Sequence, residues 1–292
     1  MTDIAFLGQG HMGAPMAGRL AEAGHRTTVW NRTAARCAPA AERGALTAAT
    51  PAEAVRGAEV VITMLRDGDS VAAVLFGDHG AADHLAPGAV LVEMSTTGPD
   101  AVHALRGKLR ADVALLDAPV VGSVPQATGG ELRILLGGAE ADAERVAGVL
   151  AVLGSVDRVG DLGAGASAKL IANLVTIATF SLIGESLALG DRMGLTADRT
   201  LDLLERSAIG GFVGRVRDRV GAADVPTRFG LGLAEKDLAL VLAAGADPAG
   251  VAAGAHKPFA DAVAAGLADR DISAVIADMR SRVGSADERR AL

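Results

Sequence analysis

The sequence predicts an α/β fold for the first half of the chain and an all-helical fold for the last third, joined by one long helix. Short apolar runs alternate with helical patterns up to residue 162, which is typical of a doubly wound parallel sheet. Residues 163–192 contain no proline and are apolar on nearly every face, as in a long buried helix. From residue 193 onward only helical patterns occur. We therefore expect a sheet domain over 1–162, an interdomain helix over 163–192 and an all-α domain over 193–292.

The strands are expected where short apolar runs end in glycine or turn residues. They fall at 4–7, 27–30, 59–64, 89–94, 113–117, 131–136 and 156–159. Helical patterns between them cover 12–24, 51–57, 68–76, a segment that begins at Pro99, and 141–153. In the last third, helices are expected over 196–206, 212–220, 231–244, 248–266 and 272–283. Ligands of such sheets bind at the carboxyl ends of the strands.

Composition excludes several classes of protein. The 292 residues are 50% hydrophobic and only 2% aromatic, and a net charge of -7 argues against nucleic acid as the main partner. The single cysteine, Cys37, rules out internal disulfides and fits a reducing cytosol. The first apolar run is too short for a signal peptide, and polar residues interrupt the long helix. The six histidines lack metal-ligand spacing, so we expect a soluble, cytoplasmic protein without a metal site.

A glycine-rich loop follows the first predicted strand and opens the first predicted helix. The loop fits the G-x-G-x-x-G pattern of a Rossmann-type fold, in which backbone N–H groups and the helix N-terminus hold a dinucleotide pyrophosphate. The alternative is a tight turn that binds nothing. The candidate cofactor contacts here are Gly8, Gln9, Gly10, His11, Met12 and Gly13.

The end of the second predicted strand bears on the choice of cofactor. NAD-preferring folds usually place Asp or Glu there to hold the adenosine ribose. This chain has Asn31, Arg32 and Thr33 instead, so no carboxylate repels a 2′-phosphate and a guanidinium is available to bind it. We expect NADP(H) rather than NAD(H). The alternative is that Arg32 is solvated and Thr33 caps the next helix.

Further residues lie at the predicted carboxyl ends of other strands and are expected to line one crevice with the glycine loop. They are Leu65, Arg66, Ser95, Thr96, Gly122 and Ser123. Met64, next to Leu65, is a further candidate cofactor contact. Lys169 and Asn173 stand four residues apart on the long helix and therefore share one face of it. Burying an ammonium group costs free energy unless it has a partner or a function. The alternative is a lysine whose stem is buried while its charge reaches water.

Five separated motifs together extend over the whole chain. They are residues 6–17, 93–96 (Glu-Met-Ser-Thr), 117–122 (Asp-Ala-Pro-Val-Val-Gly), 163–173 and 235–238 (Glu-Lys-Asp-Leu). With them the chain resembles the β-hydroxyacid dehydrogenases, a family that includes 3-hydroxyisobutyrate dehydrogenase, tartronate semialdehyde reductase and the glyoxylate/succinic semialdehyde reductases. The resemblance implies a nucleotide-binding domain joined through a long helix to a helical domain.

The resemblance also implies roles for particular residues. Leu65 and Thr96 match cofactor contacts, and Lys236 matches a lysine that reaches back over the cofactor. Lys169 matches the catalytic lysine, the general acid/base, and Asn173 its substrate-orienting partner. The substrate would then be a small carbonyl or hydroxy acid of the glyoxylate, succinic semialdehyde or 3-hydroxyisobutyrate type. Candidate substrate contacts are Ser95, Val121, Gly122, Ser123, Lys169 and Asn173.

One position departs from the family pattern. Val121 stands where the family usually has a serine that helps to grip the substrate carboxylate. Losing such a hydroxyl removes about 1–3 kcal/mol of binding free energy. Either Ser123 substitutes for it, or the substrate is not a standard short hydroxy acid.

The sequence also allows two alternative functions, and it predicts an oligomeric state. An imine reductase would have the same architecture, and residues 24–33 resemble that class, but those enzymes generally carry Asp or Tyr at the position of Lys169. A cofactor-binding regulator without turnover is the third reading. The apolar long helix and the alanine- and leucine-rich helical domain predict a homo-oligomer, either a dimer or an assembly of dimers.

Overall fold

Residues Met1–Leu170 form one of two structural units and are built around a mostly parallel sheet of nine strands. The computed structural model describes residues 1–222 and 225–290, with residues 283–290 as backbone only. The strands are β1 (Asp3–Leu7), β2 (Arg26–Trp30), β3 (Leu46–Thr47), β4 (Val60–Thr63), β5 (Val90–Glu93), β6 (Ala114–Asp117), β7 (Val120–Val121), β8 (Leu132–Gly137) and β9 (Gly154–Gly160). Their order is β3-β2-β1-β4-β5-β6-β8-β7, and β9 also pairs with β8.

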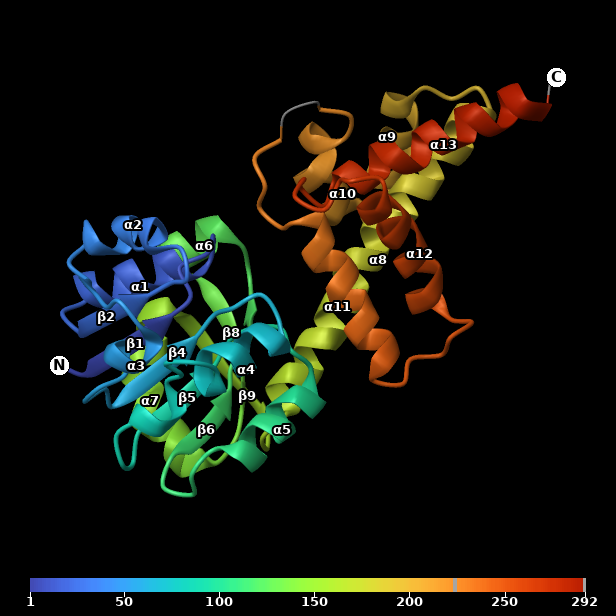
Figure 1. Ribbon diagram of the computed structural model, residues 1–292. Helices are drawn as coiled ribbons and strands as arrows, with labels where there is room; N and C mark the ends of the chain where they lie inside the picture. The colour runs from blue at the N-terminus through green and yellow to red at the C-terminus, as the bar shows by residue number, and fades with distance from the viewer. Residues whose placement is uncertain (223–224, 291–292) are drawn as a thin grey trace. The chain divides into compact units, whose positions relative to one another are not determined.

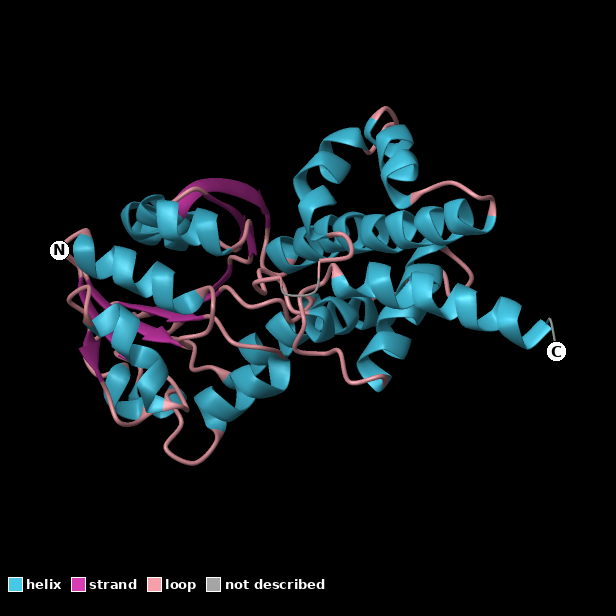
Figure 2. Cartoon of the chain, turned by 90° about the horizontal axis from the view of Figure 1, so that it is seen from above, coloured by secondary structure: helices cyan, strands magenta, loops and turns pink. Residues whose placement is uncertain are grey.

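The sheet is parallel from β3 to β6, as expected for a doubly wound fold. The pairs β6–β8 and β7–β8 are antiparallel, and β8–β9 is parallel again. The helices of this unit are α1 (Gly13–Glu22), α2 (Ala38–Ala41), α3 (Pro51–Ala54), α4 (Gly68–Phe76), α5 (Pro99–Lys108), α6 (Val124–Gly129) and α7 (Glu140–Leu153). Figures 1 and 2 show these helices around the strands of the unit.

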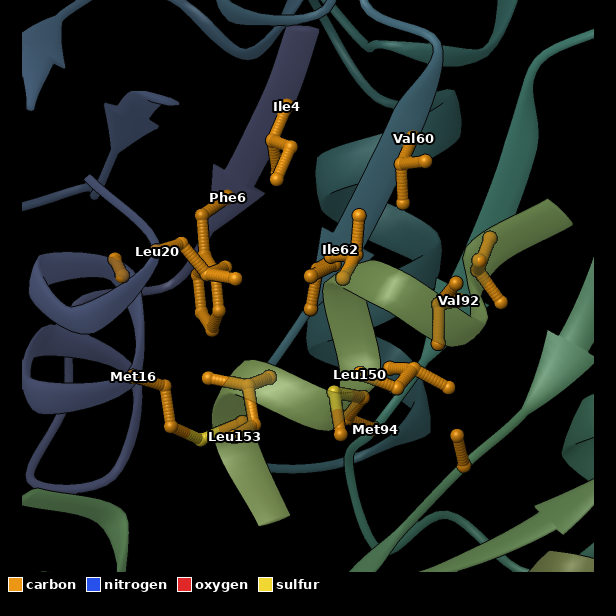
Figure 3. Packing of buried hydrophobic residues seen from close by; sticks show 14 of the residues in the cluster. Ile4, Phe6, Met16, Leu20, Val60, Ile62, Val92, Met94, Leu150 and Leu153 are labelled. Atoms are coloured by element: carbon orange, nitrogen blue, oxygen red, sulfur yellow. The ribbon is translucent and has the colours of Figure 1, made fainter. Parts of the chain in front are cut away.

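Alternate residues of the strands point to opposite faces of the sheet, and each face has its own apolar core. On one face Phe6 and Ile62 pack against Met16 and Leu20 of α1 and Leu150 of α7, as Figure 3 shows. The other face packs against α3, α4 and α5. Because both faces are covered, the central strands β4, β5 and β6 are apolar up to their last residues, which is why their runs were recognisable in the sequence.

The second unit, Ile171–Leu292, contains helices and none of the named strands in its described residues (Figure 2). The long helix α8 (Ala164–Arg192) begins in the first unit and continues into this one. The other helices are α9 (Ala197–Glu205), α10 (Gly210–Val216), α11 (Leu231–Ala243), α12 (Val251–Ala264) and α13 (Ala274–Arg290). Ile177, Phe180 and Ile183 of α8 belong to the apolar core that these helices share.

The fold class predicted from the sequence is therefore confirmed, while some elements differ in detail. The short strands β3 and β7 were not predicted, because a two-residue strand shows no hydrophobic period. The six-residue helix α6 was not predicted either. Helix α3 ends at Ala54 rather than at residue 57, and β9 spans Gly154–Gly160 rather than 156–159. The domain bounds 1–162, 163–192 and 193–292 stay a prediction.

Candidate functional site

The carboxyl ends of four neighbouring parallel strands meet at one edge of the sheet. The last residues of these strands are in register: Leu7, Thr63, Glu93 and Asp117. Gly8, Met64 and Met94 follow directly after three of these strands, and each donates a backbone hydrogen bond of 2.9 Å to the neighbouring strand. The segments predicted to bind the cofactor therefore do leave the sheet side by side.

The three glycines of the loop differ in how much space a side chain would have at each position. Gly8 has φ +108°, and a Cβ on it would lie 2.3 Å from the carbonyl oxygen of Met64. A Cβ on Gly13 would lie 2.0 Å from the carbonyl oxygen of Gly8. Gly10 has no atom within 4 Å of the corresponding position. The protein therefore requires Gly8 and Gly13 for its own packing, whereas the space beside Gly10 is open for a ligand such as a pyrophosphate.

The remaining residues of the loop contribute through different groups. Gln9 is 2% exposed: its side chain donates to the carbonyl oxygens of Phe6 and Gly8, and its backbone N–H is bonded within the protein as well. His11 is exposed and Met12 is partly buried against the core. The loop thus presents backbone N–H groups at the start of α1, which is the arrangement that suits a phosphate.

Asn31 ties this loop to the end of β2. Its Oδ1 accepts a hydrogen bond of 3.0 Å from the backbone N–H of Gln9, and its Nδ2 donates to the carbonyl oxygen of Thr33, also at 3.0 Å. Both ends of the amide are engaged within the protein. Asn31 therefore shapes the loop, and its predicted contact with the cofactor stays a prediction.

Arg32 and Thr33 are exposed at the end of β2, as a phosphate-binding pair would need to be. Thr33 precedes a short 3-10 turn (Ala34–Cys37), and its side chain makes no capping hydrogen bond. Arg36, in that turn, is a second exposed guanidinium, and neither it nor Arg32 forms an ion pair with another described residue. Arg36 was not singled out from the sequence, although it is a basic residue only four positions after Arg32.

A buried carboxyl group links the loops that follow β4 and β5. Glu93 accepts hydrogen bonds from the Thr63 hydroxyl and, at 2.7 Å, from the backbone N–H of Ser95. The Ser95 hydroxyl in turn accepts a hydrogen bond of 2.9 Å from the N–H of Leu65. Burial raises the pKa of Glu93, and the nearby charge of Asp117 also raises it, against the hydrogen bonds, which lower it. Ser95 thus holds the Leu65 loop in place, while its neighbour Thr96 is partly exposed.

The segment after β7 presents Val121 and Gly122 on the surface. Val121 is 38% exposed, and Gly122 is exposed with φ +141°. Ser123 is the N-cap of α6 and forms a capping box with Gln126, whose Oε1 accepts a hydrogen bond of 3.0 Å from the backbone N–H of Ser123. The Ser123 hydroxyl donates to the same Oε1 at 3.1 Å. Gripping a carboxylate through Ser123 would require that hydrogen bond to break. The S-x-x-Q spacing of this box was the signal for α6 that sequence reasoning overlooked.

Lys169 and Asn173 both lie on α8, one helical turn apart. Lys169 is half-buried in the first unit. Asn173 is buried in the second unit, where its Nδ2 donates to Oδ2 of Asp237 at 2.6 Å. Lys236 forms an ion pair with the other oxygen of the same carboxylate, with 2.8 Å between Nζ and Oδ1.

Asp237 therefore brings together two predicted site residues, Asn173 and Lys236. Its side chain is 3% exposed, so this pairing takes place away from bulk water, where it is stronger. Asp237 stands in the motif at residues 235–238, but no role for it was predicted from the sequence. Among the described residues there is no group of three or more His, Cys, Asp or Glu side chains that could hold a metal ion.

Fold and glycine loop together define a nucleotide-binding dehydrogenase, and comparison with known proteins agrees. The family model of the NAD binding domain of 6-phosphogluconate dehydrogenase matches residues 3–163. The model described as NAD-binding of NADP-dependent 3-hydroxyisobutyrate dehydrogenase matches residues 163–279. The chain belongs to the β-hydroxyacid dehydrogenase family, whose members are oxidoreductases.

Relatives of known activity match along nearly their whole length. A 3-sulfolactaldehyde reductase of Escherichia coli is 33% identical over 97% of this chain and 98% of its own. Glyoxylate/succinic semialdehyde reductase 1 of Arabidopsis thaliana is 34% identical over 94% of this chain and 97% of its own.

Solved structures show the same architecture. The 3-hydroxyisobutyrate dehydrogenase of Mycobacterium tuberculosis, solved with L-serine, has a TM-score of 0.83 at 31% identity and covers 96% of this chain and 99% of its own. An imine reductase of Aspergillus terreus has a TM-score of 0.62 at 26% identity and covers 94% of this chain and 98% of its own.

Proposed function

We propose that this protein is an NADPH-dependent reductase of a small carbonyl acid, and equally an NADP-dependent dehydrogenase of the corresponding hydroxy acid. The observation that carries the proposal is the arrangement along α8. Asn173 is held by the buried Asp237 carboxylate, and Lys169 stands one turn before it on the same helix. The activities named for the relatives, reduction of sulfolactaldehyde, glyoxylate and succinic semialdehyde, belong to this same chemical class.

The preference for NADP(H) rests on the end of β2. No carboxylate stands at Asn31, Arg32 or Thr33 to repel a 2′-phosphate. Two exposed guanidinium groups, Arg32 and Arg36, and the Thr33 hydroxyl are available to hold it. The backbone around Gly10 would hold the pyrophosphate, with Leu65 and Thr96 beside the nicotinamide and Lys236 as a further contact.

Lys169 is the general acid of the proposed reaction. A bound nicotinamide cofactor supplies the hydride that reduces the carbonyl carbon. Negative charge then develops on the carbonyl oxygen, where the Lys169 ammonium stabilises it by a hydrogen bond and donates a proton. In the direction of oxidation the neutral amine of Lys169 accepts the hydroxyl proton.

Asn173 orients the substrate, and Asp237 decides which end of its amide is presented. A carboxylate only accepts hydrogen bonds, so the NH₂ end of Asn173 must face Asp237. The Oδ1 atom of Asn173 is then left to accept a hydrogen bond from the hydroxyl group of the hydroxy acid. Gly122 would contribute its backbone N–H to the substrate carboxylate.

The substrate pocket differs from the family pattern at Val121. Because the Ser123 hydroxyl donates to Gln126, it is not a ready replacement for the missing serine. We infer a small aldehyde or keto acid whose anionic group is held by backbone N–H groups and lysine, rather than by a hydroxyl at position 121. Glyoxylate, succinic semialdehyde, 3-hydroxyisobutyrate and 3-sulfolactaldehyde are therefore the first compounds to assay.

Replacement of Lys169 by Ala tests the proposal. Oxidation of NADPH is followed with each aldehyde acid, and binding of NADPH is measured separately by fluorescence. We expect binding to survive and turnover to fall by at least about 10²-fold, the usual contribution of a general acid. Turnover that stays near the wild-type rate would contradict the assigned role of Lys169.

An imine reductase is the second candidate. The apolar Val121 surface suits a substrate without a carboxylate, and imine reductases share this fold. Assay of a cyclic imine beside the aldehyde acids separates the two functions. Turnover of the imine alone would reverse the order of the candidates.

The exposed face of α8 supports a homo-oligomer. Ile171, Val175, Leu182 and Leu189 are 49–67% exposed and fall on one stripe of the helix. The hydroxyls of Thr179 and Ser186 donate to carbonyl oxygens one turn earlier, which removes polar groups from this face. We expect a second copy of the chain to cover the stripe. A monomer in analytical ultracentrifugation at micromolar concentration would contradict this.

The same helix bears on where the protein resides. By length and hydropathy α8 is the single helix among the described residues that would suffice to cross a membrane. One part of its apolar surface, which includes Ile177 and Phe180, instead packs in the helical core of the second unit. We place the protein in the cytoplasm, without membrane or nucleic-acid partners.

A further inference from the structure

The first turn of α8 has no side chain of its own that can cap it. A helix begins with backbone N–H groups that lack a partner within the helix. They are commonly satisfied by a capping box, in which the residue before the helix and the third helical residue exchange side-chain hydrogen bonds. In α8 these two positions are Gly163 and Ala166, and neither has a polar side chain.

Asp117 supplies both of the missing bonds from another element of the fold. Its Oδ1 accepts a hydrogen bond of 2.8 Å from the N–H of Gly163, and its Oδ2 accepts one of 2.7 Å from the N–H of Ala166. Asp117 is the last residue of β6 and is fully buried. One carboxylate therefore caps the helix in place of a capping box, although Asp117 lies 46 and 49 residues before the two residues that it binds.

The packing around Asp117 leaves the helix start little room to move. A Cβ on Gly137 of β8 would lie 2.4 Å from Oδ1 of Asp117 and 2.8 Å from the N–H nitrogen of Gly165. A Cβ on Gly165 would lie 2.3 Å from the carbonyl oxygen of Leu135. The first turn of α8 therefore sits directly on the backbones of β6 and β8, with glycines on both sides of the contact.

We infer that Asp117 is a positioning residue for Lys169. The carboxylate fixes the first turn of α8 against the edge of the sheet from which the glycine loop also leaves, and Lys169 lies in the next turn, three residues after Ala166. The inference rests on the proposed function, since it gives the lysine nitrogen a fixed place relative to that edge. A displacement of about 1 Å in a reacting group costs about 10²-fold in rate.

Asp117→Asn tests this with little change of shape. The Asn oxygen can accept one of the two hydrogen bonds, but its NH₂ group would face the other backbone N–H, donor against donor. A matched control is Thr50→Ala, which removes the side-chain cap of α3, a hydrogen bond of 3.1 Å from the N–H of Glu53. Both variants lose a helix cap in the first unit, but Thr50 lies outside the proposed cofactor and substrate contacts.

Three measurements are made on each variant below its melting temperature. The first is NADPH binding, the second is kcat and KM for the best aldehyde acid, and the third is hydrogen exchange of the amides at 163–169. For Asp117→Asn we expect unchanged NADPH binding, a kcat lower by about 10²-fold with a smaller change in KM, and faster exchange at 163–169. For Thr50→Ala we expect wild-type kcat and exchange in that segment.

Equal kcat in the two variants would overturn the inference, as would unchanged exchange at 163–169 in Asp117→Asn. If the wild-type protein reduces none of the aldehyde acids, the proposed function fails instead. The exchange measurement then still decides whether Asp117 holds the start of α8.

Discussion

The side-chain amide of Asn173 donates a hydrogen bond of 2.6 Å to the carboxylate of Asp237, a residue 64 positions further along the chain. The same carboxylate pairs with Lys236. A single buried anion thus sets the orientation of a residue proposed to orient the substrate and of one proposed to contact the cofactor.

Replacing Asp237 with Asn should impair both of these roles. The neutral amide loses the ion pair with Lys236 and weakens the bond to Asn173, and hydrogen bonds to charged groups are worth about 1.5–3 kcal/mol. We expect kcat/KM to fall between about tenfold and a hundredfold, and NADPH to bind less tightly. Steady-state kinetics and a fluorescence titration measure the two effects.

Glu235→Gln is the control for this prediction. Glu235 is the neighbour of Lys236 on α11 and pairs with His256 at 2.8 Å, away from Asn173. If both variants lose the same activity, the effect belongs to the helix as a whole and not to the Asp237 carboxylate.

Arg32→Ala and Arg36→Ala should weaken the binding of NADPH selectively. Each guanidinium removed takes away a charge-assisted contact to the 2′-phosphate, so we expect the KM for NADPH to rise about tenfold per substitution. NADH lacks that phosphate, and its KM should change little. The two cofactors are compared at a fixed aldehyde concentration.

A matched control is Arg26→Ala, at the start of β2, where the arginine pairs with Asp3. Parallel increases of KM for NADPH and NADH in the Arg32 and Arg36 variants would show that these residues do not discriminate between the cofactors.

The Glu93→Gln variant should gain stability relative to the wild type as the pH rises. Burial raises the pKa of Glu93 in the folded protein above the ordinary value of 4.5 that applies to the unfolded chain. As the pH rises between these two values, the unfolded chain loses its proton first, so wild-type stability falls until the pH passes the folded pKa. Gln cannot ionise and escapes this loss.

Thermal unfolding of wild type and Glu93→Gln is followed from about pH 5 to pH 9. We expect the difference in melting temperature to shift in favour of the variant with increasing pH. The exposed Glu131→Gln, in the same unit, should show no such trend. A constant difference across the pH range would mean that Glu93 does not titrate differently in the folded state.

Val121→Ser restores the hydroxyl that the family usually carries at this position. If the substrate is a short carboxylic acid, the added hydrogen bond should lower its KM by about tenfold to a hundredfold, the equivalent of about 1–3 kcal/mol. Turnover of a cyclic imine should not improve. Ser123→Ala is the companion variant, and an equally large loss from it would show that Ser123 already grips the carboxylate.

Much of the fold and part of the candidate site could be read from local patterns. Local sequence patterns were enough to predict the strands β1, β4 and β5, the glycine loop and the long helix. Hydrophobic period, turn chemistry and the absence of helix-breaking residues are properties of neighbouring residues. Arg32 and Lys169 could be singled out in the same way. Helix α6 was missed although its capping residues stand in the sequence.

The hydrogen bonds that connect these parts were decided by tertiary structure alone. Asn31 spans from the end of β2 to the glycine loop, Asp237 binds Asn173, and Asp117 caps α8, over 22, 64 and 46 residues respectively. No periodicity or spacing rule pairs residues so far apart, because the partner of a buried polar group is whichever donor the packed backbone brings within about 3 Å. The sequence by itself therefore predicts the secondary-structure elements and the chemically active side chains. Only the tertiary structure determines which distant side chains form hydrogen bonds with them.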